Sequence, residues 1–230
     1  MTLYETIFQR RQVRKFEKEP LEPDTLDRIM DFISQADQLE GYPVSFELLS
    51  DREMTGATAP HYLVSYCEPC SSAYAGAGYV LQMADLYIQS MKLGSGWFMN
   101  AKPKNNRTDF CIALALGNTK EPMRKDAKDF KRIPISKISL EDNNIAQAVR
   151  LAPSSLNSQP WKVVYGAGRI ILEDIGRGMA RPILKNKLNK IDLGIAARHA
   201  ALALEEEGSV VTKRLPDESG KNFQIELSYQ

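Results

Sequence analysis

Two stretches of basic side chains have the composition of an anion site. Between residues 10 and 18 the chain has five arginines or lysines against one glutamate, and between 120 and 132 it has six against three acidic residues. The first stretch begins Arg10-Arg11-Gln12-Val13-Arg14, where Val13 interrupts the charges as though one side were fixed to a core. Guanidinium groups hold phosphate through forked hydrogen bonds. The stretches therefore indicate either two solvated surfaces or, if the fold brings them together, a phosphate site.

A loop rich in hydroxyl and amide side chains lies in the second half of the chain. It reads Ala152-Pro153-Ser154-Ser155-Leu156-Asn157-Ser158-Gln159-Pro160-Trp161. Its two prolines fix the backbone at either end. The short polar side chains between them suit hydrogen bonds to a polyhydroxylated or heteroaromatic ligand. The alternative is a turn-rich connection that binds nothing.

The other residues that could do chemistry favour structural roles. Cys67 and Cys70 form a Cys-x-x-Cys, a spacing that suits half a zinc site or a redox pair. The sequence has no second such motif, so we expect a turn at the end of a strand and no metal site. His61 and His199 have no carboxylate or serine motif around them, and we expect no catalytic side chain.

Length and composition exclude several classes of protein. The chain has 230 residues, of which 43% are hydrophobic and 26% charged, which excludes a disordered, collagen-like or disulfide-scaffold chain. Because the net charge is only +1, the protein as a whole is not attracted electrostatically to nucleic acid or to an anionic membrane surface. We expect a cytoplasmic protein for three reasons: the chain has only three cysteines, its N-terminus is unlike a signal peptide, and it has no long apolar run.

Helices and strands alternate irregularly along the chain, which predicts an α+β fold rather than a doubly wound sheet. Helices are predicted over Leu3–Gln9, Pro23–Ile33, Ala73–Leu93, Asn144–Leu151 and Ala180–Glu207, the last as two helices. Strands are predicted over Val44–Leu49, His61–Tyr66, Trp97–Met99, Phe110–Leu116, Trp161–Tyr165, Ile170–Glu173, Ser209–Lys213 and Phe223–Ser228.

An internal repeat organises these elements. The strand at Phe110 resembles the strand at Phe223 at an offset of 113, and the end of the helix before Gly94 resembles the end of the helix before Gly208 at 114. A third match, between the helices around Ile29 and Ile145, has an offset of 116. Their agreement predicts a duplication, with residues 1–135 and 136–230 as two intertwined repeats that form a pseudo-dimer. The basic stretches lie in the first repeat and the polar loop in the second.

These motifs together resemble the FMN-dependent nitroreductase family. The arginine stretch resembles the family's Arg-Arg-Ser-x-Arg opening, and the polar loop resembles its Ala-Pro-Ser-x-x-Asn-x-Gln-Pro-Trp segment. Further resemblance lies in Leu93-Gly94-Ser95-Gly96-Trp97, in Ala115-Leu116-Gly117 and in the basic pair Lys131-Arg132. Ordinary members have the loop soon after the arginines, where this chain has residues 36–43 without the pattern. The order is similar to that of the single-chain, tandem nitroreductases of the Thermotoga type.

The resemblance implies a nitroreductase-like fold, a central and mostly antiparallel sheet flanked by helices, and one FMN site at the seam between the repeats. The implied cofactor-binding residues are Arg10, Arg11, Gln12, Arg14, Met99, Asn100, Lys131, Arg132, Pro153, Ser154, Ser155 and Asn157. Of these, Met99 and Asn100 would approach flavin N5 in place of the family's glycine-containing segment. The flavin would carry the chemistry, so that no catalytic side chain is required.

The implied activity is ping-pong reduction of a nitroaromatic, a quinone or a similar small acceptor by NADH or NADPH. The implied partners are therefore small molecules, with no nucleic acid and no membrane, and the protein would be a monomeric pseudo-dimer or a weak homodimer. Two alternatives stay open at this point. One is a flavin-binding family member with little turnover, which stores or senses flavin or acts in an assembly; the other is an anion-binding module without flavin.

Overall fold

The computed structural model describes residues 1–177 and 182–230, and its strands lie mainly in two four-stranded antiparallel sheets. The first sheet has the order β1-β3-β6-β4, formed by Ser45–Ser50, His61–Tyr66, Phe110–Gly117 and Gly94–Phe98. The second has the order β7-β8-β10-β9, formed by Trp161–Gly166, Arg169–Asp174, Gln224–Tyr229 and Val211–Asp217. A small ribbon pairs β2 (Met54–Thr55) with β5 (Lys102–Pro103). The predicted α+β class is confirmed, but the strands form two sheets rather than one central sheet.

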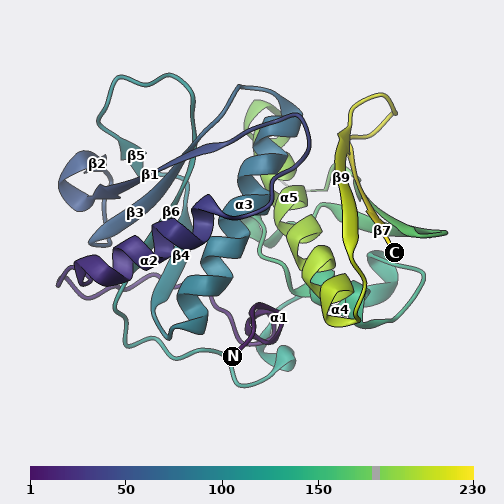
Figure 1. The fold of residues 1–230 in the computed structure, drawn as a ribbon, viewed down its shortest axis with the longest axis horizontal. Helices are drawn as coiled ribbons and strands as arrows, with labels where there is room; N and C mark the ends of the chain where they lie inside the picture. The colour runs from purple at the N-terminus through teal and green to yellow at the C-terminus, as the bar shows by residue number, and fades with distance from the viewer. Residues whose placement is uncertain (178–181) are drawn as a thin grey trace.

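Two long helices lie between the sheets. Helix α3 (Ser71–Ser90) packs on the strands of the first sheet and α5 (Pro182–Glu206) on those of the second, and the two helices cross in the centre of Figure 1. The shorter helices are α1 (Leu3–Ile7), α2 (Pro23–Ser34) and α4 (Asn144–Leu151). The predicted last helix begins at Ala180, outside the described residues, and from Pro182 to Glu206 it is one helix rather than two.

The helix crossing depends on glycine. A Cβ atom on Gly78 would overlap the carbonyl oxygen of Ile191, and one on Gly194 would overlap the carbonyl oxygen of Ala75. These two contacts mirror each other, since each residue of one contact has its counterpart 116 positions away in the other. Only a residue without a side chain allows backbones to approach this closely.

The two halves have matching topology. Each contains a short helix, two strands, a long helix and two more strands, and the strand order in each sheet follows the same pattern. This is consistent with the predicted duplication and pseudo-dimer. One hydrophobic cluster includes Ile29 and Leu81 from one half and Ile145 and Leu227 from the other. The halves therefore share a core, and the division into residues 1–135 and 136–230 stays a prediction.

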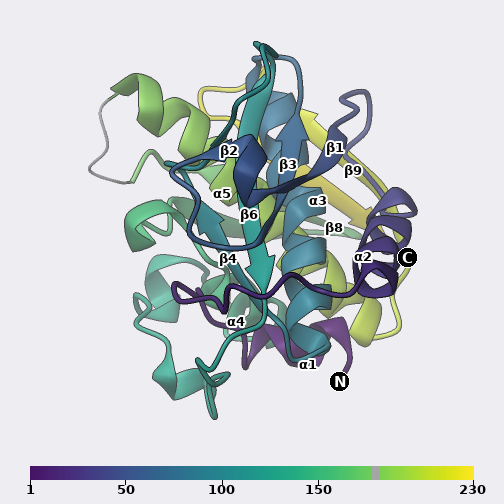
Figure 2. The same cartoon turned by 90° about the vertical axis from the view of Figure 1, so that its left-hand side faces the viewer.

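Two segments outside the sheets pass close to each other. The chain between α1 and α2 runs along the first sheet, where the Val13 amide donates to the Ser95 carbonyl oxygen at 3.0 Å (Figure 2). The chain between β6 and α4 returns past α1, and its Arg124 amide donates to the Gln9 carbonyl oxygen at 2.8 Å. No helix within the described part of the chain is long and apolar enough to cross a membrane.

Candidate functional site

The arginine stretch is fixed along β4 by its non-arginine residues. Val13 is 2% exposed, and the Gln12 side-chain amide binds the Trp97 backbone in both directions, at 2.9 and 3.0 Å. Gly96 permits this approach, because a Cβ there would overlap the Val13 carbonyl oxygen. Both the oxygen and the nitrogen of the Gln12 side-chain amide are therefore used in hydrogen bonds to β4.

Arg10 turns inward from this stretch. It is 1% exposed, and its Nε donates to Asp85 on α3 at 2.8 Å. Asp85 is held in turn by the Gln89 amide and the Ser95 hydroxyl, at 3.0 and 2.5 Å. Nη2 of Arg10 is buried without a hydrogen-bond partner among the described residues. A buried, charged donor without an acceptor is costly, so this atom is suited to an anionic ligand.

The other two predicted arginines lie nearer the surface. Arg11 donates to the Pro122 carbonyl oxygen at 2.8 Å and lies 3.6 Å from the Glu121 carboxylate. The Arg14 side chain is exposed, while its backbone amide donates to Glu121 at 2.8 Å. Of the three arginines in this stretch, only Arg10 points into the protein.

The second basic stretch brings two more guanidinium groups to Arg10. Arg124 donates to the Arg10 carbonyl oxygen and lies 4.2 Å from the centre of the Phe130 ring, while Arg132 lies 5.4 Å from that centre. Burial and the charge of Arg10 lower the pKa of Arg124 to about 10 and that of Arg132 to about 9. Nε of Arg132 is buried and has no partner in the described structure. The positive charges therefore repel one another, and an anion bound among them would relieve the repulsion.

Arg132 connects this cluster to the polar loop. Its Nη1 donates to Asn157 Oδ1 at 2.7 Å and its Nη2 to the Leu151 carbonyl oxygen at 3.1 Å. The Asn157 side-chain amide donates to the carbonyl oxygen of Lys131 at 2.9 Å, and the Lys131 side chain is exposed. The cluster of basic side chains and the polar loop, which come from different parts of the sequence, thus lie side by side.

The polar loop is held in an uncommon backbone conformation. Leu156, Asn157 and Gln159 have positive φ angles of 51°, 56° and 48°. Such angles cost non-glycine residues energy, and they are enriched at active sites and ligand-binding segments. Internal contacts hold the loop, since the Ser154 hydroxyl accepts from the Gln159 amide at 2.9 Å and Pro153 is buried.

A buried carboxyl group on α5 supports the loop from below. Both Asp192 oxygens accept from the Ser155 backbone amide at 3.0 Å, and Asp192 is 3% exposed. Burial raises the pKa of Asp192 well above its ordinary value, and the nearby Asp174 raises it further. The loop therefore rests on a carboxyl group that favours its neutral form.

Met99 meets the loop from the first half. The Ser155 hydroxyl donates to the Met99 sulfur at 3.6 Å, and Met99 is 42% exposed. Its neighbour Asn100 is also exposed. The structure thus gathers Arg10, Met99, Lys131, Arg132 and the loop residues Pro153, Ser154, Ser155 and Asn157, with Asn100 next to Met99 in the chain. Arg11 and Gln12 bind other partners, and the Arg14 side chain is exposed.

Arg124 and Asp192 belong to the same site, although the sequence did not single them out as binding residues. Arg124 lies within the basic stretch at 120–132, so charge alone pointed to it. Asp192 is the one acidic residue between Lys190 and Arg198 on a mostly apolar helix. Only its contact with a loop 37 residues away in the chain reveals its role.

The corresponding loop of the first half is closed by ion pairs. Residues 36–43 connect α2 to β1 as the polar loop connects α4 to β7. Glu40 donates its amide to the Arg214 carbonyl oxygen at 3.0 Å, and Arg214 and Arg198 both pair with Asp37. Burial opposes ionisation of Asp37, but the two arginines lower its pKa. Both cations here pair with one carboxylate, whereas Nε of Arg132 has no partner among the described residues.

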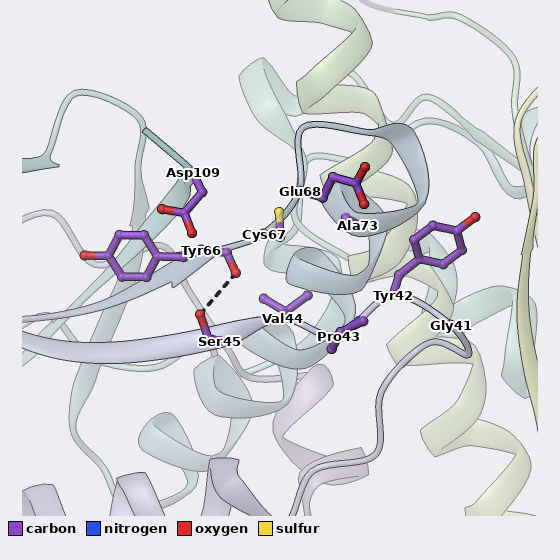
Figure 3. A pocket seen from close by; sticks show the side chains of 10 residues that line it. All are labelled: Gly41, Tyr42, Pro43, Val44, Ser45, Tyr66, Cys67, Glu68, Ala73 and Asp109. Carbon is purple, nitrogen blue, oxygen red and sulfur yellow. Dashed lines mark hydrogen bonds between the residues drawn. The ribbon is translucent and has the colours of Figure 1, made fainter. Parts of the chain in front are cut away.

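The remaining candidates have no ligand geometry. The described residues include no group of three side chains that could hold a metal ion. His61 Nε2 accepts from the Leu21 amide at 2.9 Å, and His199 contacts the Ala148 carbonyl oxygen at 2.8 Å. A separate cavity of about 410 Å³ lies at the ends of β3 and β6, away from the arginine cluster (Figure 3).

Comparison with known proteins identifies relatives of this fold. A family profile described as "Putative TM nitroreductase" matches residues 2–204. A solved "putative nitroreductase" from Thermotoga maritima is 20% identical with a TM-score of 0.70, covering 99% of this chain and 94% of that chain. A nitroreductase family protein from Clostridium difficile has 15% identity and a TM-score of 0.50, over 62% and 99% of the two chains. A third, from Desulfovibrio desulfuricans and solved in complex with FMN, has 15% identity and a TM-score of 0.47, over 61% and 96%. No curated protein matches the chain.

Proposed function

Because the chain belongs to the nitroreductase family described by that profile, we propose that it is an FMN-dependent oxidoreductase. NADH or NADPH would reduce the flavin, which would then reduce a nitroaromatic, a quinone or a similar small acceptor. The observation that supports FMN is a pair of buried donors, Nη2 of Arg10 and Nε of Arg132, that have no hydrogen-bond partner within the described part of the chain. A phosphate monoester offers these two cations several acceptor oxygens and a negative charge.

The residues present fit FMN. Arg10, Arg124 and Arg132 would hold its phosphate. The loop at Ser155 and Asn157 would line its ribityl chain and ring from the other half of the molecule. Bound flavin supplies hydride acceptance and donation at its N5 atom, and the protein contributes position and charge.

The protein's own groups would set the geometry of this site. Asp192 holds the Ser155 amide, and Arg132 holds Asn157, so the loop is fixed before any ligand binds. The cationic cluster would favour the anionic phosphate and disfavour a neutral analogue without it. Arg14, exposed at the end of the arginine stretch, would extend toward the flavin from outside.

We infer one flavin per chain. Among the described residues the polar loop and the cation cluster occur once, and the equivalent loop of the first half is closed by Asp37, Arg198 and Arg214. Both halves of the site come from one chain, so dimerisation is not needed to build it, and we expect a monomer or a weak homodimer. We propose a cytoplasmic location, because the three free cysteines fit a reducing compartment.

Reconstitution with FMN tests the proposal. We expect the purified protein to take up about one FMN per chain by absorbance, to be bleached by NADH or NADPH without oxygen, and to regain its colour with nitrofurazone or menadione. Flavin uptake without bleaching would favour the alternative, a flavin-binding protein with little turnover. Absence of flavin binding would refute the proposal, and two flavins per chain would contradict the closed second site.

A further inference from the structure

Three buried polar side chains form a stripe along α3, whose other buried residues are mostly apolar or small. They are Gln82, Asp85 and Gln89, and residues three, four or seven apart share one side of a helix. Asp85 holds Arg10, and the Gln89 side-chain amide binds the backbone of Arg11 in both directions, at 2.8 and 2.9 Å. Two members of the stripe therefore fix the arginine stretch, and Gln82 stands one turn before Asp85.

The orientation of the Gln82 side chain is fixed by His199 on α5. The Ala148 carbonyl oxygen lies 2.8 Å from His199 Nδ1, and because a carbonyl oxygen only accepts, Nδ1 carries the ring proton. Burial lowers the pKa of His199 to about 3, so the ring is neutral and Nε2 carries no proton. The amide nitrogen of Gln82 lies 3.1 Å from this Nε2 and donates to it. The amide oxygen, Oε1, is therefore turned away from the imidazole ring.

The Gln82 oxygen lacks a hydrogen-bond donor. Gln82 is fully buried, and its Oε1 atom receives no hydrogen bond from the residues that the structure describes. A buried acceptor without a donor costs free energy. Nη2 of Arg10, the residue that Asp85 holds one turn along α3, is a buried donor in the same condition. The two atoms do not bond to each other, so satisfying both requires a third group.

The pair of Gln82 and His199 lies between the arginine cluster and the polar loop. His199 and Asp192 are seven residues apart in the sequence, and hence two turns apart on one side of α5. Asp192 holds the Ser155 amide of the polar loop at 3.0 Å. Besides burial, the nearby charge of Arg10 lowers the pKa of His199. The pair thus joins the side of α3 that binds the arginine stretch to the side of α5 that supports the loop.

A group that satisfies both Gln82 Oε1 and Arg10 Nη2 must donate one hydrogen bond and accept another. The oxygens of an ionised phosphate only accept, so they suit Arg10 but not Gln82. A hydroxyl group can donate and accept at once. A phosphate ester whose chain carries hydroxyl groups therefore fits this part of the seam. An ester with a plain alkyl chain would leave the Gln82 oxygen without a donor.

On the basis of the proposed function, we propose that Gln82 Oε1 accepts a hydrogen bond from a hydroxyl group of the ribityl chain of FMN. His199 is the positioning residue that orients the Gln82 amide for this contact. The contact makes the site selective for polyhydroxylated phosphate esters over alkyl ones. Gln82 belongs to none of the motifs that resemble the nitroreductase family, and only its burial and its partner on α5 identify it.

Two flavins that differ only in the hydroxyl groups of the chain test this contact. One is FMN, and the other, the pentyl flavin, carries a pentyl phosphate chain in place of ribityl phosphate. Fluorescence quenching gives the dissociation constants of both flavins for the wild type, for Gln82→Met and for a control, Gln147→Met. Methionine is similar to glutamine in length but lacks the amide oxygen, and Gln147 is partly exposed on α4 and bonds to Asp142.

We expect Gln82→Met to reduce the preference for FMN over the pentyl flavin by roughly 2- to 12-fold, as for one hydrogen bond between uncharged groups. Gln147→Met should keep the wild-type preference. General loosening of the helices would weaken both flavins alike, so the ratio of the two dissociation constants reports the contact itself. An unchanged ratio in Gln82→Met that still binds FMN would overturn this inference and leave the proposed function standing. Absence of FMN binding by the wild type would instead refute the proposed function.

The wild type decides the question even if Gln82→Met fails to fold. Nitrogen-15 NMR shows which ring nitrogen carries the proton in each of the two histidines of the chain, and His199→Gln assigns the signals. We expect the proton of His199 on Nδ1. A proton on Nε2 would mean that Gln82 Oε1 accepts from His199 and is not free, which would overturn the proposal. Equal affinity of the wild type for FMN and the pentyl flavin would overturn it as well.

Discussion

Replacement of Arg132 by glutamine should weaken FMN binding without weakening riboflavin binding to the same extent. Two of the donor nitrogens of Arg132 already have protein partners, Asn157 and the Leu151 carbonyl oxygen. The third, Nε, is buried and has no partner in residues 1–177 and 182–230, so it is the donor available to a ligand. Riboflavin is identical to FMN except for the phosphate, so the comparison isolates the contact of the cation with the phosphate.

The expected size of this effect follows from one charge-assisted hydrogen bond. Such a bond contributes about 1.5–3 kcal/mol, which corresponds to roughly a 10- to 150-fold rise in the dissociation constant for FMN. The burial that lowers the pKa of Arg132 places the effect in the upper part of this range, because water screens a buried contact less. Loss of the Asn157 contact loosens the loop for both ligands, so riboflavin binding also weakens, but by less.

Fluorescence quenching of FMN and riboflavin measures both affinities in the same preparation. Arg132→Lys is the matched control, since it keeps the charge but loses the forked geometry, and it should fall between the wild type and Arg132→Gln. Equal losses for FMN and riboflavin, or unchanged FMN affinity in Arg132→Gln, would refute the assignment of the cluster to the phosphate.

Three further predictions address other parts of the structure. Arg14→Ala should raise the dissociation constant for FMN about tenfold or more, as expected for one charged contact; unchanged affinity in a fluorescence titration would remove Arg14 from the site. Gly194→Ala should destabilise the fold by at least about 1–3 kcal/mol in urea unfolding, because the new methyl group meets the Ala75 carbonyl oxygen, and a wild-type midpoint would show that the helices can separate without cost. Burial lowers the pKa of His199 to about 3, whereas the unfolded chain takes up the proton near 6.5, so stability should fall as pH drops below 6.5. Between pH 7 and 5 the wild type should lose about 2 kcal/mol more than His199→Gln, and parallel losses in the two proteins would contradict this reasoning.

The sequence predicted most elements because their patterns are local. The apolar face of α3 and the apolar run of β6 can each be recognised from a short stretch of consecutive residues. Strand β4 begins at Gly94, three residues before the predicted strand, because Gly94, Ser95 and Gly96 lack the branched or aromatic residues typical of strands. Its glycines are instead explained by close contacts that only the structure reveals, with Val13 at Gly96 and with Thr119 at Gly94.

The site was harder to predict because its side chains have competing partners. The motif resemblance treated Arg10, Arg11 and Gln12 alike, but Arg11 faces Glu121 and Gln12 binds the Trp97 backbone. Which side chain of a stretch turns inward depends on contacts with residues far away in the sequence. Asp192 was missed for the same reason, since a single acidic residue in a helix carries no local signal of the loop that it supports.

The glycine contacts at the crossing of α3 and α5 make the middle of the molecule stiff. Each helix is pressed against a carbonyl group of the other at two mirrored points, so neither can slide or turn without opening both. The distance between the two halves at their seam is therefore fixed by this pair of helices. Any adjustment to molecules of different size must come from the segments that border the seam, above all from Met99 and Leu156, whose side chains are 42% and 72% exposed.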